Sequence, residues 1–394
     1  MRRRHRLAIA LGALLLAVGL VVGLTFLGGR AEGPLEGALR RLGDAVSGLE
    51  SAVVDAVRGP GRSAELEWFA PYRTDATALV GTDTILLGAY HGEIPGTLEG
   101  VLELEAALGV TLPLIHGYFA WGDGAEHAFP ETFVEAVADL GSVPVITWEP
   151  WLTAFESSLH PELPLRAERD ENGLADIATG LYDFYVDAWA RRAAEHGEPI
   201  FLRFAHEMND PYRYPWGPQN NEPWEFIEAW NHVVERFRAA GADNVVWVWS
   251  PHVAYSGYEW FYPGDGTVDW VATGALNYGT VARWSEWWRF DEIFGNHYDT
   301  LAALGKPIMI AEFSTLAVGG DRERWFRQAL DGLPERYPAV RSLLFFEVSS
   351  DATVTYQELD WSIAGDSTAA RTVAGGIAEW EGSPYAPAAD PETE

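Results

Sequence analysis

The chain has 394 residues, a formal net charge of -31 and no cysteine. A surface this acidic repels polyanions, which argues against nucleic acid as a partner. The lack of cysteine excludes a disulfide, a thiolate nucleophile and a lipid-modified N-terminal cysteine. Hydrophobic residues make up 48% of the chain and 18 residues are Trp, which is ample for a substantial core.

The first 29 residues have the pattern of a membrane anchor or a signal peptide. The basic stretch MRRRHR precedes an uncharged apolar run at residues 7–29, which is long enough to cross a bilayer as a helix. The basic flank predicts that the N-terminus lies inside and the remainder outside. Because LGGRAEG lacks an A-x-A-like cleavage site, we expect an uncleaved anchor at the cell membrane; a cleaved signal peptide, which would leave a secreted protein, is the alternative.

Residues 30–66 are predicted to form an amphipathic helical linker. Apolar residues recur there at intervals of mostly three or four, namely Leu35, Leu39, Leu42, Val46, Leu49, Val53 and Val57. A coiled-coil stalk, a helix lying on the membrane and a helix docked on the domain all fit this stripe. Residues 67–385 are predicted to be the main domain, and residues 386–394 form an acidic tail.

The main domain alternates apolar strand-like runs with helix-period segments. Strands are predicted at residues 84–90, 111–118, 143–148, 199–206, 244–250, 271–277, 307–313 and 342–348. Intervening helices are predicted at residues 98–108, 131–140, 177–196, 224–240, 322–333 and 369–380. Eight such units indicate an α/β fold, a (β/α)8 TIM barrel, and the stretch GAYHGEIPG after the first strand lacks the GxGxxG of an open nucleotide-binding sheet.

Two glutamates end predicted strands, where the chemistry of such a barrel takes place. Glu207 ends the fourth strand in FLRFAHEMNDPYRYPWG, and Glu312 ends the seventh in KPIMIAEFS. An acid surrounded by aromatic rings has a raised pKa, as a general acid on a sugar requires, so Glu207 is the candidate acid. Glu312 would act as the nucleophile if hydrogen-bond donors keep it ionised. The pair predicts a retaining glycoside hydrolase, whose two carboxyl groups lie about 5 to 5.5 Å apart.

Other interpretations of these residues remain open or can be discarded. A buried salt bridge, for example between Glu207 and Arg203, is the alternative for either glutamate taken alone. Glu149 and Glu347 also end strands and could bind substrate hydroxyls or orient the pair. A zinc site is not expected, because HExxH needs a histidine where this chain has Asp210. No G-x-S-x-G elbow is present, so no serine hydrolase is predicted, and water is the only co-reactant expected.

At these motifs the chain resembles glycoside hydrolase family 26, a family of (β/α)8 retaining enzymes that includes endo-β-1,4-mannanases, mixed-linkage β-glucanases and β-1,3-xylanases. The shared motifs are LLGAYHG, RFAHEMND with YPWG, NVVWVWSPH, YPGDGTVDW, PIMIAEFS and DWSI. The resemblance implies that Glu207 is the acid/base and Glu312 the nucleophile, with His206, Asn209 and Trp216 around the cleavage point. Asn209 is also placed to bond a sugar 2-hydroxyl.

Tryptophans at strand ends either pack in the core or offer flat faces to sugars. The predicted substrate-binding residues are Tyr90, Trp121, Trp148, His206, Asn209, Trp216, Trp249 and Tyr278. Two positions depart from the family pattern: Asp210 replaces a glycine, and Leu276 aligns with a tyrosine that hydrogen-bonds the nucleophile. Tyr278 is the candidate substitute for that tyrosine.

The function expected from the resemblance is endo-acting hydrolysis of a β-1,4-linked polysaccharide, either β-mannan or mixed-linkage β-glucan, by double displacement. The alternatives are a weakly active or inactive carbohydrate-binding relative that guides an exopolysaccharide, and an enzyme that transfers the glycosyl group to a sugar acceptor.

Overall fold

The computed structural model describes residues 61–352 and 357–385. The predicted anchor at residues 1–29, most of the linker and the acidic tail lie outside these ranges. Within them, no helix is both long and apolar enough to cross a membrane. The first described elements are α3 (Gly61–Glu65), η1 (Glu67–Arg73) and α4 (Ala76–Val80).

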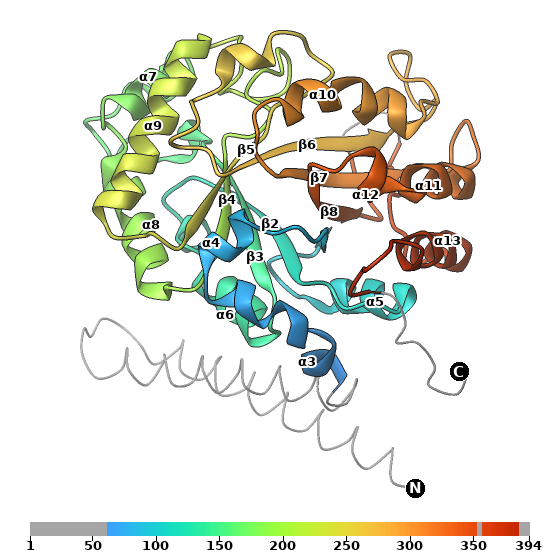
Figure 1. The fold of residues 1–394 in the computed structure, drawn as a ribbon. Coiled ribbons are helices and arrows are strands. Elements are labelled where there is room, and N and C mark those ends of the chain that lie inside the picture. The colour runs from blue at the N-terminus through green and yellow to red at the C-terminus, as the bar shows by residue number, and fades with distance from the viewer. Residues whose placement is uncertain (1–60, 353–356, 386–394) are drawn as a thin grey trace, which may run out of the picture. The chain divides into compact units, whose positions relative to one another are not determined.

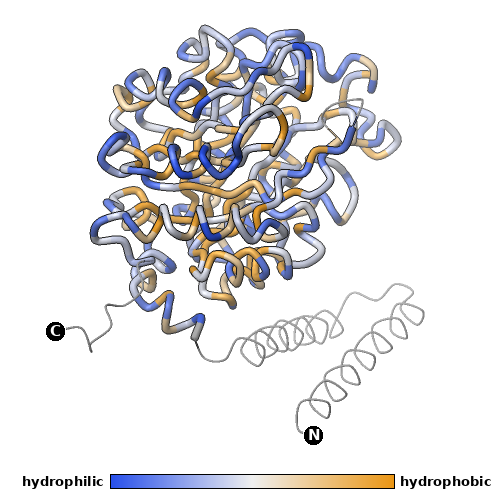
Figure 2. The backbone as a smooth tube through the Cα atoms, turned by 90° about the vertical axis from the view of Figure 1, so that its right-hand side faces the viewer, coloured by the Kyte–Doolittle hydropathy of each residue, from blue (hydrophilic) through white to orange (hydrophobic). Residues whose placement is uncertain are grey.

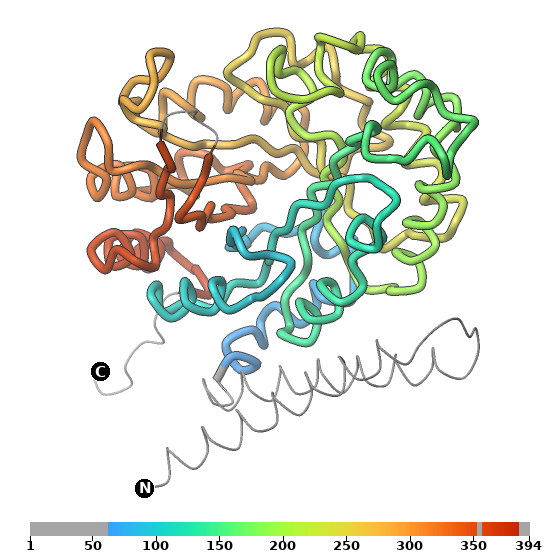
Figure 3. The backbone as a smooth tube through the Cα atoms, turned by 180° about the vertical axis from the view of Figure 1, so that it is seen from behind, coloured from blue at the N-terminus to red at the C-terminus, as the bar shows by residue number. Residues whose placement is uncertain are grey.

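Eight parallel strands form a closed barrel in chain order, which confirms the predicted TIM barrel (Figure 1). They are β1 (Leu86–His91), β2 (Leu114–Ala120), β3 (Val143–Glu149), β4 (Ile200–Phe204), β5 (Val245–Trp249), β6 (Trp270–Asn277), β7 (Ile308–Thr315) and β8 (Val340–Glu347). Each overlaps a predicted strand. The barrel closes where β8 pairs with β1, so the first and last strands of the domain are neighbours. The path of the chain around the barrel can be followed in Figure 3.

Helices surround the barrel in the order that the sequence pattern predicts. The main ones are α5 (Glu99–Leu108), α6 (Glu131–Asp139), α8 (Asp183–His196), α9 (Pro223–Ala239), α11 (Arg322–Leu330) and α13 (Ser367–Ala378). Shorter elements are η2 (Ala125–His127), η3 (Leu152–Ala154), η4 (Arg166–Glu168), α7 (Gly173–Ala178), η5 (Tyr258–Phe261), η6 (Asp291–Gly295), α10 (Asn296–Ala302) and α12 (Leu333–Arg336).

The predicted helix at residues 177–196 is interrupted. Helix α7 ends at Ala178 and α8 begins at Asp183. Between them Gly180 has a φ of 86°, a left-handed conformation that glycine adopts without a steric penalty. The apolar periodicity continues across this turn, so the sequence pattern alone does not reveal the break.

Side chains alternate between two apolar layers along the strands, as the period of a β-strand requires. Val145, Phe201 and Val248 belong to an inner cluster contributed by the barrel strands, whereas Ile146 and Leu202 belong to the outer cluster against the helices. Hydrophobic stretches accordingly run through the middle of the domain, and hydrophilic stretches gather on its outer loops (Figure 2).

A β-bulge in β7 determines which way Glu312 points. Thr273 of β6 is in register with Ile310, but the next residue pairs with Glu312, so Ala311 is skipped. Ala311 packs in the inner cluster and Phe313 in the outer one. Strict alternation after Ala311 would turn Glu312 outward toward the helices; the extra residue keeps its carboxylate inside the barrel.

Candidate active site

Glu207 and Glu312 both lie at the carboxyl ends of the strands. Glu312 is within β7, and Glu207 follows β4 in a tight turn. Glu207 and Ala205 have φ values of 53° and 45°, in the left-handed region that non-glycine residues rarely occupy. The Glu207 N–H donates to the Ser250 carbonyl at 2.7 Å, which fixes this turn to the end of β5. Such backbone strain is typical of functional sites.

Glu312 is held by two donors from inside the barrel. The Tyr118 hydroxyl donates to its Oε1 at 2.6 Å, and Nη2 of Arg203 donates to the same atom at 2.7 Å. Burial by itself raises the pKa of Glu312, but Arg203 and the Tyr118 hydroxyl outweigh burial and hold the pKa below its usual value. Glu312 is therefore an ionised carboxylate, as a nucleophile must be. The suggested ion pair between Arg203 and Glu207 is wrong, because Arg203 pairs with Glu312.

Glu207 has the opposite electrostatic character. Burial raises its pKa, and the Glu312 charge adds to this effect. His252 and Arg213 act against it: Nε2 of His252 lies 4.0 Å from Oε1 and Nη1 of Arg213 lies 3.9 Å from Oε2. Oε2 has no hydrogen-bond partner among the described residues. Two carboxyl groups with pKa values pushed apart are the signature of an acid and a base that divide the work.

His206, Tyr214 and Trp216 pack together and support the turn that carries Glu207. Nε2 of His206 lies 3.0 Å from the Tyr214 hydroxyl, and Nε1 of Trp216 donates to the His206 carbonyl at 2.8 Å. Burial lowers the pKa of His206 well below its usual value, so the ring is neutral. Trp216 is 2% exposed and stacks on Tyr214, with ring centres 4.6 Å apart. The expectation that Trp216 offers a face to sugar is therefore wrong.

Trp121, Trp148 and Trp249 are also misassigned as sugar platforms, because all three are completely buried. On β3 the residues that point inward are Val145, Thr147 and Glu149, so Trp148 points outward and packs against Trp189 of α8 at 4.6 Å. The same alternation turns Trp249 of β5 outward. Trp121 packs against Trp148 at 4.6 Å. A side chain at the end of a strand reaches the barrel mouth only if it also points toward the inside of the barrel.

Asn209 joins two loops. Its amide nitrogen donates to the His252 and Tyr255 carbonyls at 2.8 and 3.3 Å, and its oxygen accepts the His252 N–H at 2.8 Å. Both amide hydrogens are therefore committed to protein, and Asn209 holds His252 beside Glu207 instead of donating to a sugar. Asp210 accepts the Tyr212 N–H at 2.7 Å and so shapes the same loop.

Of the two further glutamates, only Glu149 faces the site. Its Oε2 accepts Nε1–H of Trp151 at 3.0 Å, and its Oε1 lies 3.9 Å from Nδ1 of His206. Glu347 instead accepts the backbone N–H groups of Ile363 and Ala364 at 2.7 and 2.9 Å. Its expected role at the site is wrong, since it anchors the segment after β8.

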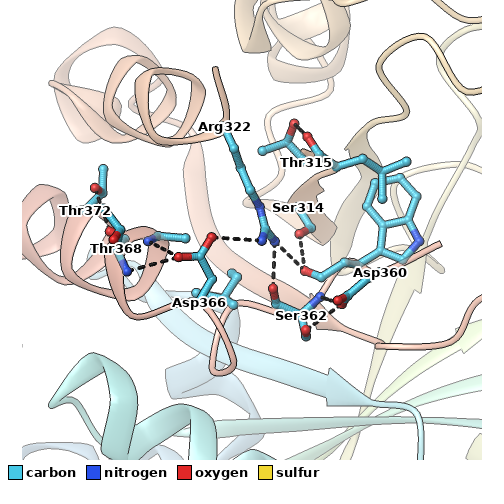
Figure 4. A network of polar contacts seen from close by, with 12 residues as sticks. Ser314, Thr315, Arg322, Asp360, Ser362, Asp366, Thr368 and Thr372 are labelled. Atoms are coloured by element: carbon cyan, nitrogen blue, oxygen red, sulfur yellow. Dashed lines mark hydrogen bonds and ion pairs between the residues drawn. The ribbon is translucent and has the colours of Figure 1, made fainter. Parts of the chain in front are cut away.

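That segment carries Trp361, which forms part of an apolar wall at the barrel mouth. Arg322 donates to the Trp361 and Ser362 carbonyls at 2.9 and 2.8 Å, and the Ser314 hydroxyl donates to the Trp361 carbonyl at 2.8 Å (Figure 4). Tyr278 packs edge-on against Trp361 with ring centres 4.8 Å apart. Residues that share this wall are Tyr90, Leu276, Tyr278, Val281, Leu316, Phe346, Val348, Leu359 and Trp361.

The structure adds functional residues that the sequence reasoning missed. Tyr118 of β2 supplies the tyrosine donor expected from the Leu276 position on β6, so Glu312 has an orienting donor without it. Arg203, His252 and Arg213 surround the two glutamates. Strand alternation could have predicted Tyr118 and Arg203, because both lie an even number of residues from inward-facing residues of β2 and β4. No comparable pattern marks His252 and Arg213, which lie on loops.

One group among the described residues has the composition to hold a cation. Ligand atoms of Glu207, Asp210 and His252 lie within 4.8 Å of one another. The Arg213 guanidinium stands 3.9 Å from Glu207, and Nδ1 of His252 accepts the Ala254 N–H at 3.3 Å, which places the ring proton on the Nε2 atom facing Glu207. Both features disfavour a cation there.

A closed (β/α)8 barrel with a carboxyl of raised pKa after β4 and a carboxylate of lowered pKa on β7 is the arrangement of a two-carboxylate glycoside hydrolase. Residues 180–319 match the model of Glycosyl hydrolase family 26. The matched segment contains both glutamates, and the match confirms the resemblance to glycoside hydrolase family 26 that the motifs carry.

The chain is also similar to individual proteins. The chain is 31% identical to Endoglucanase H of Acetivibrio thermocellus over 286 residues, which cover 70% of this chain and 28% of that protein. It is 25% identical to a mannan endo-1,4-beta-mannosidase of Bacillus subtilis over 42% of this chain and 41% of that protein. The chain thus spans well under half the length of these relatives. GH26C from Muricauda sp. MAR_2010_75 shares the fold at a TM-score of 0.56, with 16% identity over 79% of this chain and 91% of that one.

Proposed function

We propose that this protein is an endo-acting O-glycosyl hydrolase that cleaves a β-linked polysaccharide with retention of anomeric configuration. The proposal is carried by the different states of the two glutamates. Tyr118 and Arg203 hold Glu312 ionised, whereas burial raises the pKa of Glu207. Two-carboxylate hydrolysis needs one group of each kind, and retention is inferred from the resemblance to glycoside hydrolase family 26.

In the first step Glu312 attacks the anomeric carbon while Glu207 gives its proton to the leaving oxygen. The glycosyl bond to the leaving sugar breaks, and an ester to Glu312 forms. In the second step Glu207, now ionised, takes a proton from water, whose oxygen displaces Glu312 from the anomeric carbon. Arg203 and Tyr118 stabilise the carboxylate of Glu312 when it leaves. Oε2 of Glu207, which has no hydrogen-bond partner among the described residues, can meet the substrate oxygen.

The substrate class is proposed from the relatives. Their names include an endoglucanase, a mannan endo-1,4-beta-mannosidase and a beta-1,3-xylanase. We infer a β-1,4-linked backbone, either β-mannan or mixed-linkage β-glucan. Release of reducing sugar from mannan, barley-type β-glucan, xylan and cellulose by the full chain tests this proposal, and activity confined to xylan would contradict it.

The catalytic assignment is tested by isosteric amides. Glu312→Gln and Glu207→Gln should each lower kcat on the preferred polysaccharide by at least about 10²-fold, while thermal unfolding stays within a few degrees of wild type. Glu195→Gln is the matched control, because the Glu195 side chain is 62% exposed and pairs with Arg192 on the same helix, α8. If hydrolysis survives in both variants, the assignment is wrong. If the wild-type protein retains polysaccharide but never cleaves it, the chain is a binding relative and the hydrolase proposal fails.

We also infer from the sequence that residues 1–29 hold the enzyme at the outer face of the cell membrane. This inference rests on the apolar run and its basic flank.

A further inference from the structure

Exposed apolar side chains gather on two adjacent loops beside the site. Trp284 is 60% exposed and Trp288 is 37% exposed, both on the segment between β6 and η6, and Val318 after β7 is 43% exposed. Single exposed apolar side chains are ordinary on protein surfaces, but a group of them marks a binding surface. Nothing in the proposed chemistry of Glu207 and Glu312 requires these residues.

The loop that carries Trp284 is built rigidly. Gly279 has a φ of 57°, and a Cβ added there would clash with the Val318 carbonyl oxygen, so the two loops touch at this point. The Thr280 N–H donates to the same carbonyl at 3.3 Å. A turn follows in which the Ser285 hydroxyl accepts the Ala282 N–H at 3.0 Å, with Trp284 at its tip. A ring on such a support binds without first losing much conformational freedom.

Trp284 is joined to the catalytic residues through Tyr278. The rings of Trp284 and Tyr278 meet edge-on with centres 5.2 Å apart, and Tyr278 in turn packs on Trp361 at 4.8 Å. Further ring contacts lead from Trp361 through Phe346 and Tyr90 to Tyr118, with centres 6.1, 5.6 and 4.8 Å apart in turn. The Tyr118 hydroxyl donates to Glu312. A series of packed aromatic rings therefore connects Glu312 to Trp284, and among them the ring of Trp284 is exposed.

We propose that Trp284 is a sugar-binding platform, on which a pyranose ring of the polysaccharide stacks at some distance from the bond that is cleaved. The C–H face of a pyranose packs on an indole ring without needing charge. Stacking of this kind does not depend on the net charge of the protein, which is -31. This inference rests on the proposed function and extends it to the length of substrate that the enzyme recognises.

The test compares long and short substrates in the full chain. Trp284→Ala should raise KM for the preferred polysaccharide about tenfold, the effect of one lost stacking contact. It should leave kcat/KM unchanged on an aryl glycoside of a single sugar, which is too short to reach Trp284. Trp284→Phe keeps a flat ring and should retain most of the affinity. Trp224→Ala is the matched control: it removes a tryptophan that is 55% exposed on α9, and KM should not change.

A second readout separates this inference from the hydrolase proposal. In affinity electrophoresis through gels that contain the polysaccharide, Trp284→Ala in the inactive Glu312→Gln background should migrate faster than Glu312→Gln alone. Equal retardation and an unchanged KM would overturn the platform even if hydrolysis is confirmed. Equal loss of kcat/KM on the long and the short substrates would also overturn it, because the residue would then act on the fold of the site. If Trp284→Ala abolishes retardation by the polysaccharide but the wild-type protein never hydrolyses it, the platform is supported and the hydrolase proposal is refuted.

Discussion

The hydroxyl of Tyr118 and the guanidinium of Arg203 converge on one oxygen of Glu312, and this convergence sets the chemistry of the site. Hydrogen bonds to the charged form of a carboxyl lower its pKa, whereas burial without partners raises it. Glu312 and Glu207 are both glutamates with side chains only 12% and 11% exposed, and their different partners give their pKa values opposite shifts. The catalytic role of a glutamate therefore follows from the hydrogen-bond donors around its carboxyl group, and not from its being a glutamate.

Tyr118→Phe should slow hydrolysis and move its pH dependence. Removal of the donor raises the pKa of Glu312, so a larger fraction is protonated and unreactive at a given acidic pH. The acid limb of kcat/KM should shift to higher pH by about one unit, and kcat at the optimum should fall about tenfold. Steady-state kinetics between pH 4 and pH 9 measure both effects.

The control for this change is Tyr262→Phe, which removes a hydroxyl that donates to Asp265 at 2.8 Å on an exposed part of the chain. Its pH profile should coincide with that of the wild type. A Tyr118→Phe profile that keeps its acid limb while kcat falls would show that the hydroxyl does not set the ionisation of Glu312.

At the scale of elements, the segment after β8 depends on a cap that serves two purposes. Asp366 accepts the N–H groups of Thr368 and Ala369 at 3.0 and 3.1 Å and so begins α13 (Ser367–Ala378), and it also lies 3.5 Å from Nη1 of Arg322 (Figure 4). Arg322 in turn holds the carbonyls around Trp361. The N-terminus of one helix thereby helps to position the apolar wall of the site.

Asp366→Ala should lower the free energy of unfolding by about 1 kcal/mol, the usual cost of a lost N-cap. Asp366→Asn keeps the cap and loses only the partly exposed ion pair, so its stability should lie within about 0.5 kcal/mol of the wild type. Urea denaturation of both variants measures the difference. If Asp366→Asn is as unstable as Asp366→Ala, the ion pair with Arg322, and not the cap, supports the helix.

Element placement was largely predictable from sequence, because apolar runs and helical periodicity are local properties. All eight strands were expected close to where they lie. The break at Gly180 and the bulge at Ala311 were not, since neither interrupts the apolar pattern. The bulge matters most: with unbroken alternation after Ala311, Glu312 would face the helices.

At the scale of the whole molecule, residues 1–29 predict where the enzyme works. An uncleaved anchor should keep the full chain in the membrane fraction of expressing cells, with the barrel accessible to added protease from outside. Replacement of Leu14, Leu15 and Leu16 by Asp should release it, because charged residues in the middle of a bilayer are strongly disfavoured. Wild-type protein recovered in the medium with a new N-terminus would identify a cleaved signal peptide instead.

The sequence by itself determined the alternation of strands and helices, the barrel, the family motifs and the choice of the two glutamates. Each of these depends on a pattern of residues that are close together along the chain. Tertiary structure alone decided what surrounds those glutamates. Tyr118 and Arg203 are 194 and 109 residues away from Glu312, and only closure of the barrel brings them to its oxygen. The helices packed around the barrel bury Trp148 and Trp249, which lie on the outer faces of β3 and β5, and Trp121, which follows β2 and packs against Trp148.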